Sequence, residues 1–370
     1  MYLKNLELIQ FKNYERQQLE FNSEVNCFLG ENGAGKTNLL DAIHYLCLTK
    51  SAFLPVDSQH IRHGQSFFTL KGTFELAQKT LSLSCIFESH KKKRFEVNGS
   101  PYQRLSEHIG LLPLVMIAPD DTLIITGGSE ERRKFFDGMI SQTNSHYLQL
   151  LIRYQHYLKQ RNALLKRLAE ERKKDLLQLS PYDQKLIQLS VEIHDIRSRF
   201  LTDFIPYFLD HYATISGQKE NVTIDYKSQV SQPDFSKNFT TSLDQDLFRK
   251  RTGHGIHKDD FDFQLDGYPI KKFGSQGQKK SFLISLKLAQ FFIFKTLKGT
   301  TPLLLLDDIF DKLDDRRIFH LLSQVAKKEF GQLFITDARP ERSKEILKTI
   351  RARVSFFSIN KGRLSKENVD

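Results

Sequence analysis

The sequence predicts an α/β fold that is interrupted by an inserted helical hairpin. Three observations support this fold class. A short apolar strand, a glycine-rich loop and a helical pattern follow one another between residues 25 and 49. Apolar residues alternate at period two up to about residue 125, and heptad spacing replaces this pattern from 129 to about 215. Strand patterning returns at 303–306 and at 332–338, as a doubly wound sheet requires.

Composition limits the classes of protein to which the chain can belong. At 370 residues it exceeds the size of one typical hydrophobic core, which favours two lobes. Its net charge of +11 favours a polyanionic partner, although each basic cluster alone is more typical of a solvated face. No apolar run reaches the ~20 residues that span a bilayer, and the three cysteines are isolated in apolar surroundings. We therefore expect a cytoplasmic protein with no membrane partner, zinc site or disulfide.

The N-terminal 125 residues are expected to form paired strands. Alternating apolar patterns occupy 2–11, 16–22, 67–76, 80–89 and 93–99. Residues 97–102 have the composition of a hairpin turn, and an apolar run at 112–121 ends in a proline and two acids.

Residues 28–38, FLGENGAGKTN, contain a glycine-rich loop of the pattern G-x-x-x-x-G-K-[ST]. Glycines let successive backbone N–H groups surround a chain of phosphates, Lys36 can neutralise β- and γ-phosphate oxygens, and the Thr37 hydroxyl can bind Mg²⁺. The flanking strand and helix separate this motif from an ordinary glycine-rich turn. A nucleoside triphosphate is the expected ligand. The predicted binding residues are Gly30, Glu31, Asn32, Gly33, Ala34, Gly35, Lys36 and Thr37.

The segment 129–215 is expected to form two long antiparallel helices. Apolar residues recur at heptad spacing from Leu151 to Leu168, with Arg161 interrupting the seam, and again from Tyr182 to Phe200. Pro181 suits the start of the second helix. Each arm would then be about 45–50 Å long at ~1.5 Å per residue, which is too short for the extended coiled coils of chromosome-organising ATPases.

Asp307 and Asp308 follow four consecutive leucines, a pattern typical of a strand buried on both faces. An acid at the end of such a strand, opposite the glycine-rich loop, can hold Mg²⁺ through its water shell, and Asp308 could orient the attacking water. Lys36, Asp307 and Asp308 are therefore the predicted catalytic residues, and Thr37 and Asp307 the predicted Mg²⁺ ligands. The alternative is that the two acids begin a turn.

A second candidate phosphate-binding end lies at residues 274–278, before a long amphipathic helix. One fold does not need two such ends for the same nucleotide, whereas a dimer can use one from each subunit. We therefore expect the second end to contact the nucleotide of a partner copy in trans, through Ser275, Gln276, Gly277 and Gln278. The alternative is a helix cap made by Ser275 with incidental glycines.

Together these segments resemble the ABC-type ATPase heads of the SMC class and, within it, the RecF family of bacterial DNA replication and repair proteins. The motifs that carry the resemblance are GENGAGKTN at 30–38, SQGQ at 275–278, LLLLDD at 303–308, DKLD at 311–314, LELIQFKNY at 6–14, and residues 117–137 and 255–263. The likeness runs from residue 1 almost to the end. Local departures lie at Ile256, Lys258, Gly274, Asp311 and Asp337.

The resemblance implies an ABC-type P-loop ATPase head with an inserted helical lobe. Residues 1–128 and 216–370 would form the discontinuous head, called lobe I, and 129–215 the helical arm, called lobe II. By the same resemblance Lys12 and Asn13 lie near the nucleotide, and Asp314 of the D-loop lies at the dimer seam. The implied cofactors are ATP and Mg²⁺.

The resemblance also implies a function in DNA repair, DNA replication and the SOS response. Proteins of this family bind ATP, dimerise on duplex and gapped DNA without sequence preference, and are released by slow, DNA-stimulated hydrolysis to ADP and phosphate. They act with RecO and RecR to load RecA at gaps and stalled forks.

Three other classes share part of this pattern. An SMC-like or transporter-type ABC ATPase would have the same head, but a transporter subunit has no use for a net charge of +11. A small-molecule kinase would share the glycine-rich loop but not the helix that follows SQGQ. A GTPase would need an N-K-x-D motif, and residues 360–363 read NKGR.

Overall fold

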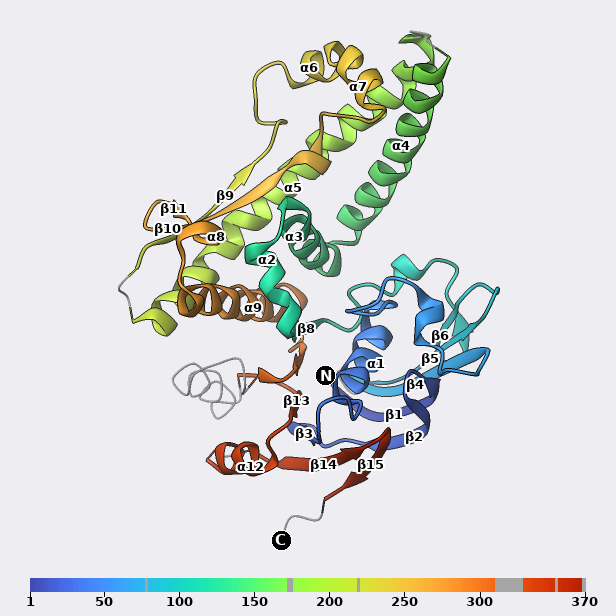
Figure 1. Ribbon diagram of the computed structural model, residues 1–370, viewed down its shortest axis with the longest axis vertical. Coiled ribbons are helices and arrows are strands. Elements are labelled where there is room, and N and C mark those ends of the chain that lie inside the picture. Colours follow the sequence, from blue (N-terminus) through green and yellow to red (C-terminus); the bar gives the residue numbers. More distant parts are fainter. Residues whose placement is uncertain (77–78, 172–175, 218–219, 310–328, 350–351, 368–370) are drawn as a thin grey trace. The chain divides into compact units, whose positions relative to one another are not determined.

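The computed structural model describes residues 1–76, 79–171, 176–217, 220–309, 329–349 and 352–367. The chain divides into two compact units, of which unit 1 comprises Met1–Asp121 and Ile284–Asp370, and unit 2 comprises Thr122–Leu283 (Figure 1). These boundaries differ from the expected 128/129 and 215/216 division. Residues 216–283 group with the helical arm because their strands and short helices pack on it.

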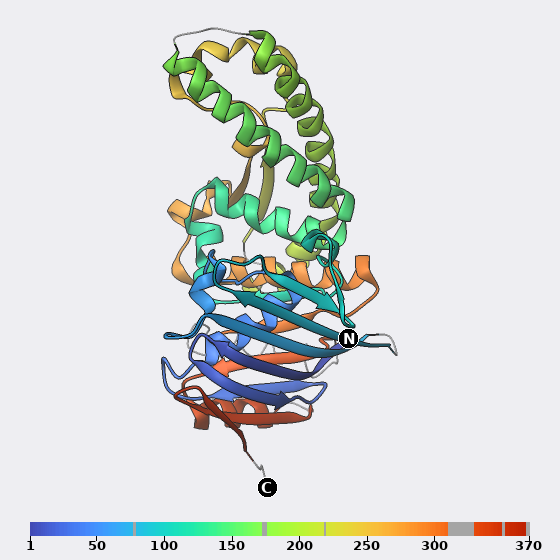
Figure 2. The same cartoon turned by 90° about the vertical axis from the view of Figure 1, so that its right-hand side faces the viewer.

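The expected strand pairing of the N-terminal segment is confirmed in unit 1. A six-stranded sheet has the order β2-β1-β4-β5-β6-β7, and all of its pairs are antiparallel (Figure 2). Its strands are β1 (Tyr2–Phe11), β2 (Tyr14–Glu20), β4 (Phe67–Leu76), β5 (Lys79–Glu88), β6 (Arg94–Val97) and β7 (Ser100–Pro101). Alternating buried residues on β1, such as Leu6 and Leu8, explain the period-two pattern.

The second sheet of unit 1 carries the nucleotide-binding motifs. Its order is β15-β14-β3-β13-β12-β8, and the five strands from β14 to β8 run parallel. They are β3 (Val25–Leu29), β8 (Leu114–Ile117), β12 (Leu303–Leu306), β13 (Leu333–Asp337), β14 (Val354–Asn360) and the antiparallel β15 (Arg363–Lys366). Because β13 lies between β3 and β12, the carboxyl ends of all three strands meet at one edge, where ligands bind in such sheets.

Helix α1 (Lys36–Leu48) is buried almost all round. It contacts β4 and β5 of the first sheet and β8 and β13 of the second. Its apolar residues belong to one core cluster together with strands of both sheets, and Leu39, Ile43 and Leu46 are fully buried. A helix whose residues are buried on nearly every side is expected in the centre of a core.

The remaining elements among the described residues of unit 1 connect these layers. They are η1 (Asp57–His60), η2 (Leu105–Glu107), α12 (Pro340–Lys348) and the larger part of α9 (Gln276–Lys298). Lys287 of α9 is buried and donates to the Met116 carbonyl at 2.8 Å and to Asp121 at 2.5 Å. The helix is thereby tied to the end of β8.

Unit 2 contains the expected helical hairpin. Helices α4 (Ser145–Glu170) and α5 (Leu176–Ser216) pack against each other, with 26 and 41 residues. At ~1.5 Å per residue they are about 39 and 61 Å long, so the arms are unequal. Pro181 does not begin the second helix, since α5 starts at Leu176 and contains both Pro181 and Pro206. Packing against α4 retains helical backbone before the proline, although its missing N–H removes one helical hydrogen bond.

A three-stranded sheet of unit 2, in the order β11-β10-β9, was not predicted. Its strands are β9 (Val222–Lys227), β10 (Asp260–Leu265) and β11 (Tyr268–Pro269). Phe261 of β10 stacks on Phe136 at a ring-centroid distance of 4.0 Å, which joins the sheet to α3. The other elements are η3 (Pro119–Thr122), which crosses the boundary with unit 1, α2 (Leu123–Thr126), α3 (Ser129–Thr143), α6 (Phe235–Thr241), α7 (Leu243–Arg249), η4 (Ile256–Lys258), α8 (Ile270–Phe273) and the first turns of α9.

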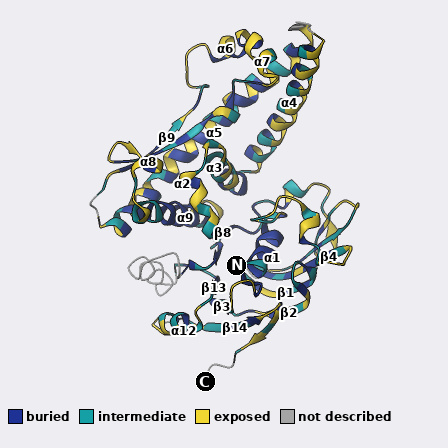
Figure 3. Ribbon diagram, in the orientation of Figure 1, coloured by how far each residue is buried: buried dark blue, intermediate teal, exposed yellow. Residues whose placement is uncertain are grey.

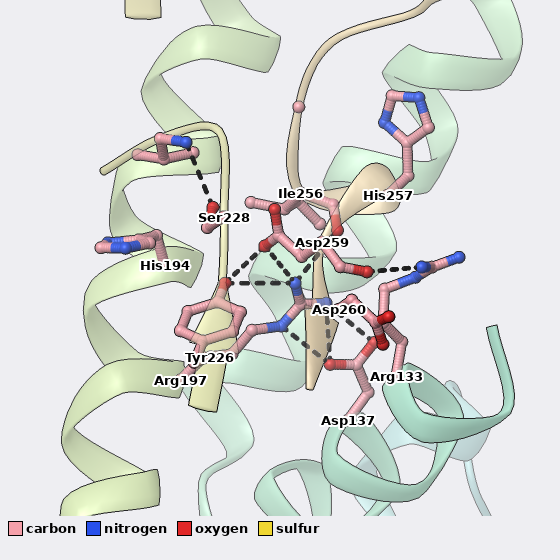
Figure 4. Close-up of polar contacts among 12 residues, drawn as sticks. Arg133, Asp137, His194, Arg197, Tyr226, Ser228, Ile256, His257, Asp259 and Asp260 are labelled. Carbon is pink, nitrogen blue, oxygen red and sulfur yellow. Dashed lines mark hydrogen bonds and ion pairs between the residues drawn. The ribbon is translucent and has the colours of Figure 1, made fainter. Parts of the chain in front are cut away.

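A buried polar network joins α3, α5, β9 and the segment before β10. Arg197 of α5 is 1% exposed and pairs with Asp137 and Asp259, each at 2.9 Å (Figure 4). Tyr226 also donates to Asp259. Since a guanidinium this deeply buried is stable only when its donors are satisfied, the network determines how the three elements pack.

Candidate nucleotide-binding site

The glycine-rich loop lies between β3 and the start of α1 in unit 1. Gly33 and Gly35 have φ values of 81° and 118°, a region that side chains strongly disfavour. A Cβ on Gly35 would lie 2.3 Å from Asn13 Nδ2, and one on Gly30 would lie 2.4 Å from the Ile359 carbonyl oxygen. Glycine is therefore favoured by conformation at Gly33, by space at Gly30, and by both at Gly35. The remaining predicted loop residues, Glu31, Asn32 and Ala34, lie in the same turn.

Residues of the β1–β2 turn hold the loop from outside. Asn13 donates to the Ala34 carbonyl at 3.0 Å and accepts from Asn38 of α1 at 2.8 Å. Tyr14, which the sequence analysis missed, donates to the Gly35 carbonyl at 2.9 Å. The structure thus places Asn13 against the loop.

Lys12 pairs with a residue of α1 and not with the glycine-rich loop. Its ammonium group lies 2.7 Å from the fully buried carboxylate of Asp41, one turn beyond Thr37 on α1. The same carboxylate accepts from Ser51 and from the Ala52 amide. Lys12 therefore ties the β1–β2 turn to α1, and Asp41 ties α1 to the segment that follows it.

Lys36 is the first residue of α1 and is 4% exposed. Its ammonium group donates to the carbonyls of Gly30 and Glu31 at 2.8 and 3.1 Å. The side chain thus curls over the loop, and its charge lies among the backbone groups that would surround the phosphates.

Thr37 and Asp307 form the candidate Mg²⁺ site. The Thr37 hydroxyl lies 3.0 Å from each carboxylate oxygen of Asp307, which follows β12. Hard oxygen donors of this kind suit Mg²⁺, so the donor set fits the ion. Burial raises the pKa of the Asp307 carboxyl, and hydrogen bonds from Thr336 and Thr37 oppose that effect.

Thr336 is a site residue that the sequence analysis missed. It lies on β13 between the two motif strands, and its hydroxyl donates to Asp307 at 2.7 Å and accepts from the Asp308 amide at 2.9 Å. Asp308 has a φ of 47°, so this bond supports a left-handed turn immediately after the strand. No sequence motif marks Thr336, because its contact with Asp307 depends on the order of the strands in the sheet.

The SQGQ segment lies in unit 2 and has the geometry of a capping box. Ser275 Oγ accepts from the Gln278 amide at 3.2 Å, and Gln278 Oε1 accepts from the Ser275 amide at 2.7 Å. The helix-cap alternative thus describes a real local structure. Gln278 also donates to Glu220 at 2.9 Å, whereas Ser275 and Gln276 are exposed and Gly277 is intermediate. A Cβ on Gly274 would lie 2.6 Å from the Ile270 side chain, which explains the glycine before the motif.

Asp314, the predicted D-loop residue, and Asp311 lie outside the described residues.

Comparison with known proteins identifies the family. The model of the RecF/RecN/SMC N terminal domain matches residues 2–358. A DNA replication and repair protein RecF from Cytophaga hutchinsonii is 44% identical over 366 residues, which cover 99% of this chain and 97% of that protein. The chain belongs to the RecF family. A RecF from Flavobacterium johnsoniae is likewise 44% identical, over 97% of this chain and all of that protein.

Solved structures agree with this assignment. One solved structure is described as the recombination mediator protein RecF-ATP in the RecFOR pathway. It has a TM-score of 0.89 and 30% identity, and the match covers 99% of this chain and 98% of the solved chain. An Smc head bound to a domain of ScpA has a TM-score of 0.59 and 16% identity, over 100% of this chain and 98% of its own, and shows a shared fold. The expected ABC-type head with a helical lobe is therefore confirmed, within a family of ABC/SMC-type ATPases. Among the helices of the described ranges, none is long and apolar enough to cross a membrane.

Proposed function

We propose that this RecF-family chain is an ATP-gated DNA-binding protein of recombinational repair and replication-fork maintenance. The observation that carries the proposal is the contact of Thr37 with both carboxylate oxygens of Asp307 at the N-terminus of α1. It places an Mg²⁺-binding pair next to a loop whose amides and lysine suit a triphosphate. The RecF relatives whose structures contain ATP support the same ligand.

Each site residue has a proposed role in slow, DNA-stimulated hydrolysis of ATP to ADP and phosphate. Lys36 holds the β- and γ-phosphates, Thr37 and Asp307 hold Mg²⁺, and Asp308 orients the attacking water. Mg²⁺ would neutralise charge that develops on the phosphates. The raised pKa of the Asp307 carboxyl does not oppose this role, because a bound cation favours the ionised form.

The SQGQ segment is proposed to complete the nucleotide site of a second copy. Its exposed Ser275 and Gln276 begin α9, where the helix dipole favours an anion. Gly277 permits close approach, and the side chain of Gln278 would exchange its bonds to the Ser275 amide and Glu220 for contacts across the dimer. Asp314 is assigned to the seam by resemblance alone.

The proposed partners follow from charge and family. A net charge of +11 suits a DNA backbone, which is bound without base reading when phosphate contacts dominate. ATP-driven closure of two copies would join two basic surfaces around one duplex or gap and strengthen binding. We propose that the chain acts in the cytoplasm with RecO and RecR to help load RecA, and that hydrolysis releases it.

Replacing Ser275 with arginine tests the contact in trans. Ser275→Arg should leave ATP binding to the single chain intact but abolish ATP-driven dimerisation and hydrolysis, because a bulky cation would occupy the interface. Light scattering with and without ATP measures dimerisation, and phosphate release measures hydrolysis. Ser236→Arg is the matched control, since Ser236 is an exposed residue of α6 in the same unit. If Ser275→Arg still formed dimers of normal mass with ATP, the proposed contact in trans would be wrong.

Replacing Asp308 with asparagine tests the release step. Asp308→Asn should dissociate from labelled duplex DNA more slowly than wild type when ATP is present, because the closed dimer can no longer hydrolyse ATP. The off-rate is measured at two salt concentrations, and binding by both proteins should weaken steeply with salt. Asp234→Asn, at an exposed aspartate of unit 2, should behave as wild type. Equal off-rates for Asp308→Asn and wild type, with affinity insensitive to salt, would contradict an ATP-gated clamp.

A further inference from the structure

A basic segment of unit 2 follows α7. Residues 249–258 read RKRTGHGIHK and contain four lysines or arginines, two histidines and no acid. We call Arg249, Lys250, Arg251 and Lys258 the basic tip. The nucleotide site in unit 1 uses none of these residues.

The basic tip is held by a buried ion pair. Arg161 of α4, which interrupts the apolar seam in the sequence, is fully buried and donates to Asp246 of α7 at 2.6 Å and to Thr252 at 2.9 Å. Asp246 accepts in turn from the Gly253 amide at 2.8 Å. Asn162, the next residue of α4, accepts from the Thr252 amide at 2.8 Å. The loop after α7 is therefore fixed at both sides, which lowers the entropy cost of binding a ligand there.

Most charges of the basic tip are not neutralised within the chain. In the described ranges, Arg249, Arg251 and Lys258 have no carboxylate within ion-pair distance, and Lys250 reaches Glu170 only at 3.9 Å between two half-exposed side chains. The pKa of Lys258 is lowered first by burial and then by the charges of Arg251, Arg133 and Arg249. These cations therefore share one electropositive surface.

Phe248 lies in the last turn of α7, directly before Arg249 of the basic tip, and is 88% exposed. The opposite face of α7 is the one that packs, because Leu243 and Leu247 contact the small apolar cluster of Leu165, Leu168 and Leu179. Figure 3 shows α7 with a buried and an exposed side. The chain has 30 phenylalanines, and most of those described lie in its cores. An exposed ring in this position contributes little to folding and is accessible to a ligand.

We propose that Phe248 and the basic tip form a binding surface for single-stranded DNA, in which one unpaired base stacks on the Phe248 ring. Arg249, Arg251 and Lys258 would contact the phosphates on either side. Single-strand binding surfaces combine cations along the backbone with aromatic rings for the bases. A fully paired duplex presents phosphates but no free base face, so the exposed ring favours an unpaired nucleotide.

This inference rests on the proposed function and deepens it. DNA gaps contain both duplex and single-stranded regions, and unit 2 would recognise the single-stranded part. The ring would thereby direct a protein that binds DNA mainly through charge to sites where a strand is missing.

The test compares Phe248→Ala with wild type on two DNAs of equal length, one gapped and one fully paired, with ATP present. Stacking of one base is worth ~1–3 kcal/mol, so the affinity of Phe248→Ala for gapped DNA should fall by about 5- to 150-fold, with the paired duplex unchanged. A fluorescent adenine analogue in the gap should be quenched by wild type and not by the variant. Phe248→Tyr should retain both properties, whereas Phe248→Leu keeps apolar area without a ring and should lose them. Tyr268→Ala, at an exposed aromatic outside the basic tip, is the matched control.

A second variant tests the charges. Arg251→Ala should weaken binding to both DNAs. It should also reduce the slope of log affinity against log salt concentration by about 0.7 to 0.9, the values for one lost phosphate contact on single-stranded and duplex DNA. Equal loss on both DNAs in Phe248→Ala, or full activity of Phe248→Leu, would overturn the stacking role and would favour an apolar contact with a protein. If wild type binds neither DNA, the proposed function itself fails. If wild type binds both and Phe248→Ala matches it, the further inference alone is wrong.

Discussion

Lys36→Arg is expected to reduce ATP hydrolysis by about 100-fold or more, while some ATP binding persists. The side chain is 4% exposed and its ammonium group bonds to two loop carbonyls at 2.8 and 3.1 Å. A planar guanidinium retains the charge but cannot occupy the space of a compact ammonium group, so the charge is displaced from the phosphates. Losing one positioned donor to a developing charge typically costs ~100- to 1,000-fold in rate.

Phosphate release at saturating ATP and duplex DNA measures this effect, and ATP binding is measured separately by equilibrium titration. Lys71→Arg is the matched control, since Lys71 is an exposed lysine of β4 with a weak ion pair to Glu7 at 3.5 Å. Turnover near the wild-type value in Lys36→Arg would show that the glycine-rich loop does not serve hydrolysis.

Arg197→Met is expected to destabilise unit 2 by about 3–5 kcal/mol, because it leaves the buried carboxylate of Asp259 and the partly buried carboxylate of Asp137 without their cation. In the wild-type network Arg197 also donates to the Ile256 carbonyl at 3.1 Å (Figure 4). Urea unfolding measures the loss. Arg16→Met should change stability by less than about 1 kcal/mol, since its pair with Glu7 is at the surface.

The pH dependence of Arg197→Met gives a sharper test. Burial already raises the pKa of the Asp259 carboxyl, and removal of the cation should raise it further. A folded-state pKa above the unfolded value means that the folded state gains stability as the pH falls through it. The deficit of the variant should therefore shrink at acidic pH, and adding Asp259→Asn should restore part of it at neutral pH. A deficit that is independent of pH would mean that lost packing, and not an uncompensated charge, causes the effect.

Local motifs made the nucleotide-binding half of unit 1 predictable from sequence. The loop at 30–37 and the leucine run before Asp307 each combine a strand with a chemically distinctive end, so their positions in a parallel sheet follow from pattern alone. Contacts between distant segments were not predictable. Thr336 has an unremarkable place in an apolar strand, and only the strand order places it between Asp307 and the loop.

The extent of unit 2 could not be inferred for the same reason. Residues 222–227 alternate as a strand should, but their partner β10 lies more than thirty residues away, and nothing in either segment specifies which core they join. Pro181 shows the limit of a local preference, because contacts with α4 override the tendency of proline to begin a helix. Arg161 was recognised as an interruption of the seam, but its partner Asp246 is 85 residues away.

The burial of α1 between two sheets has a thermodynamic consequence. The amides that would face the phosphates are the first turn of a helix whose side chains belong to the central core of unit 1. Their positions are set by core packing before any ligand arrives, so little ordering entropy is lost when a nucleotide binds. By linkage, the free energy of nucleotide binding adds to the stability of the whole core and not to the loop alone. Nucleotide binding and the folding of unit 1 are thus coupled. A chain with bound nucleotide should therefore unfold and be degraded more slowly than a chain without it.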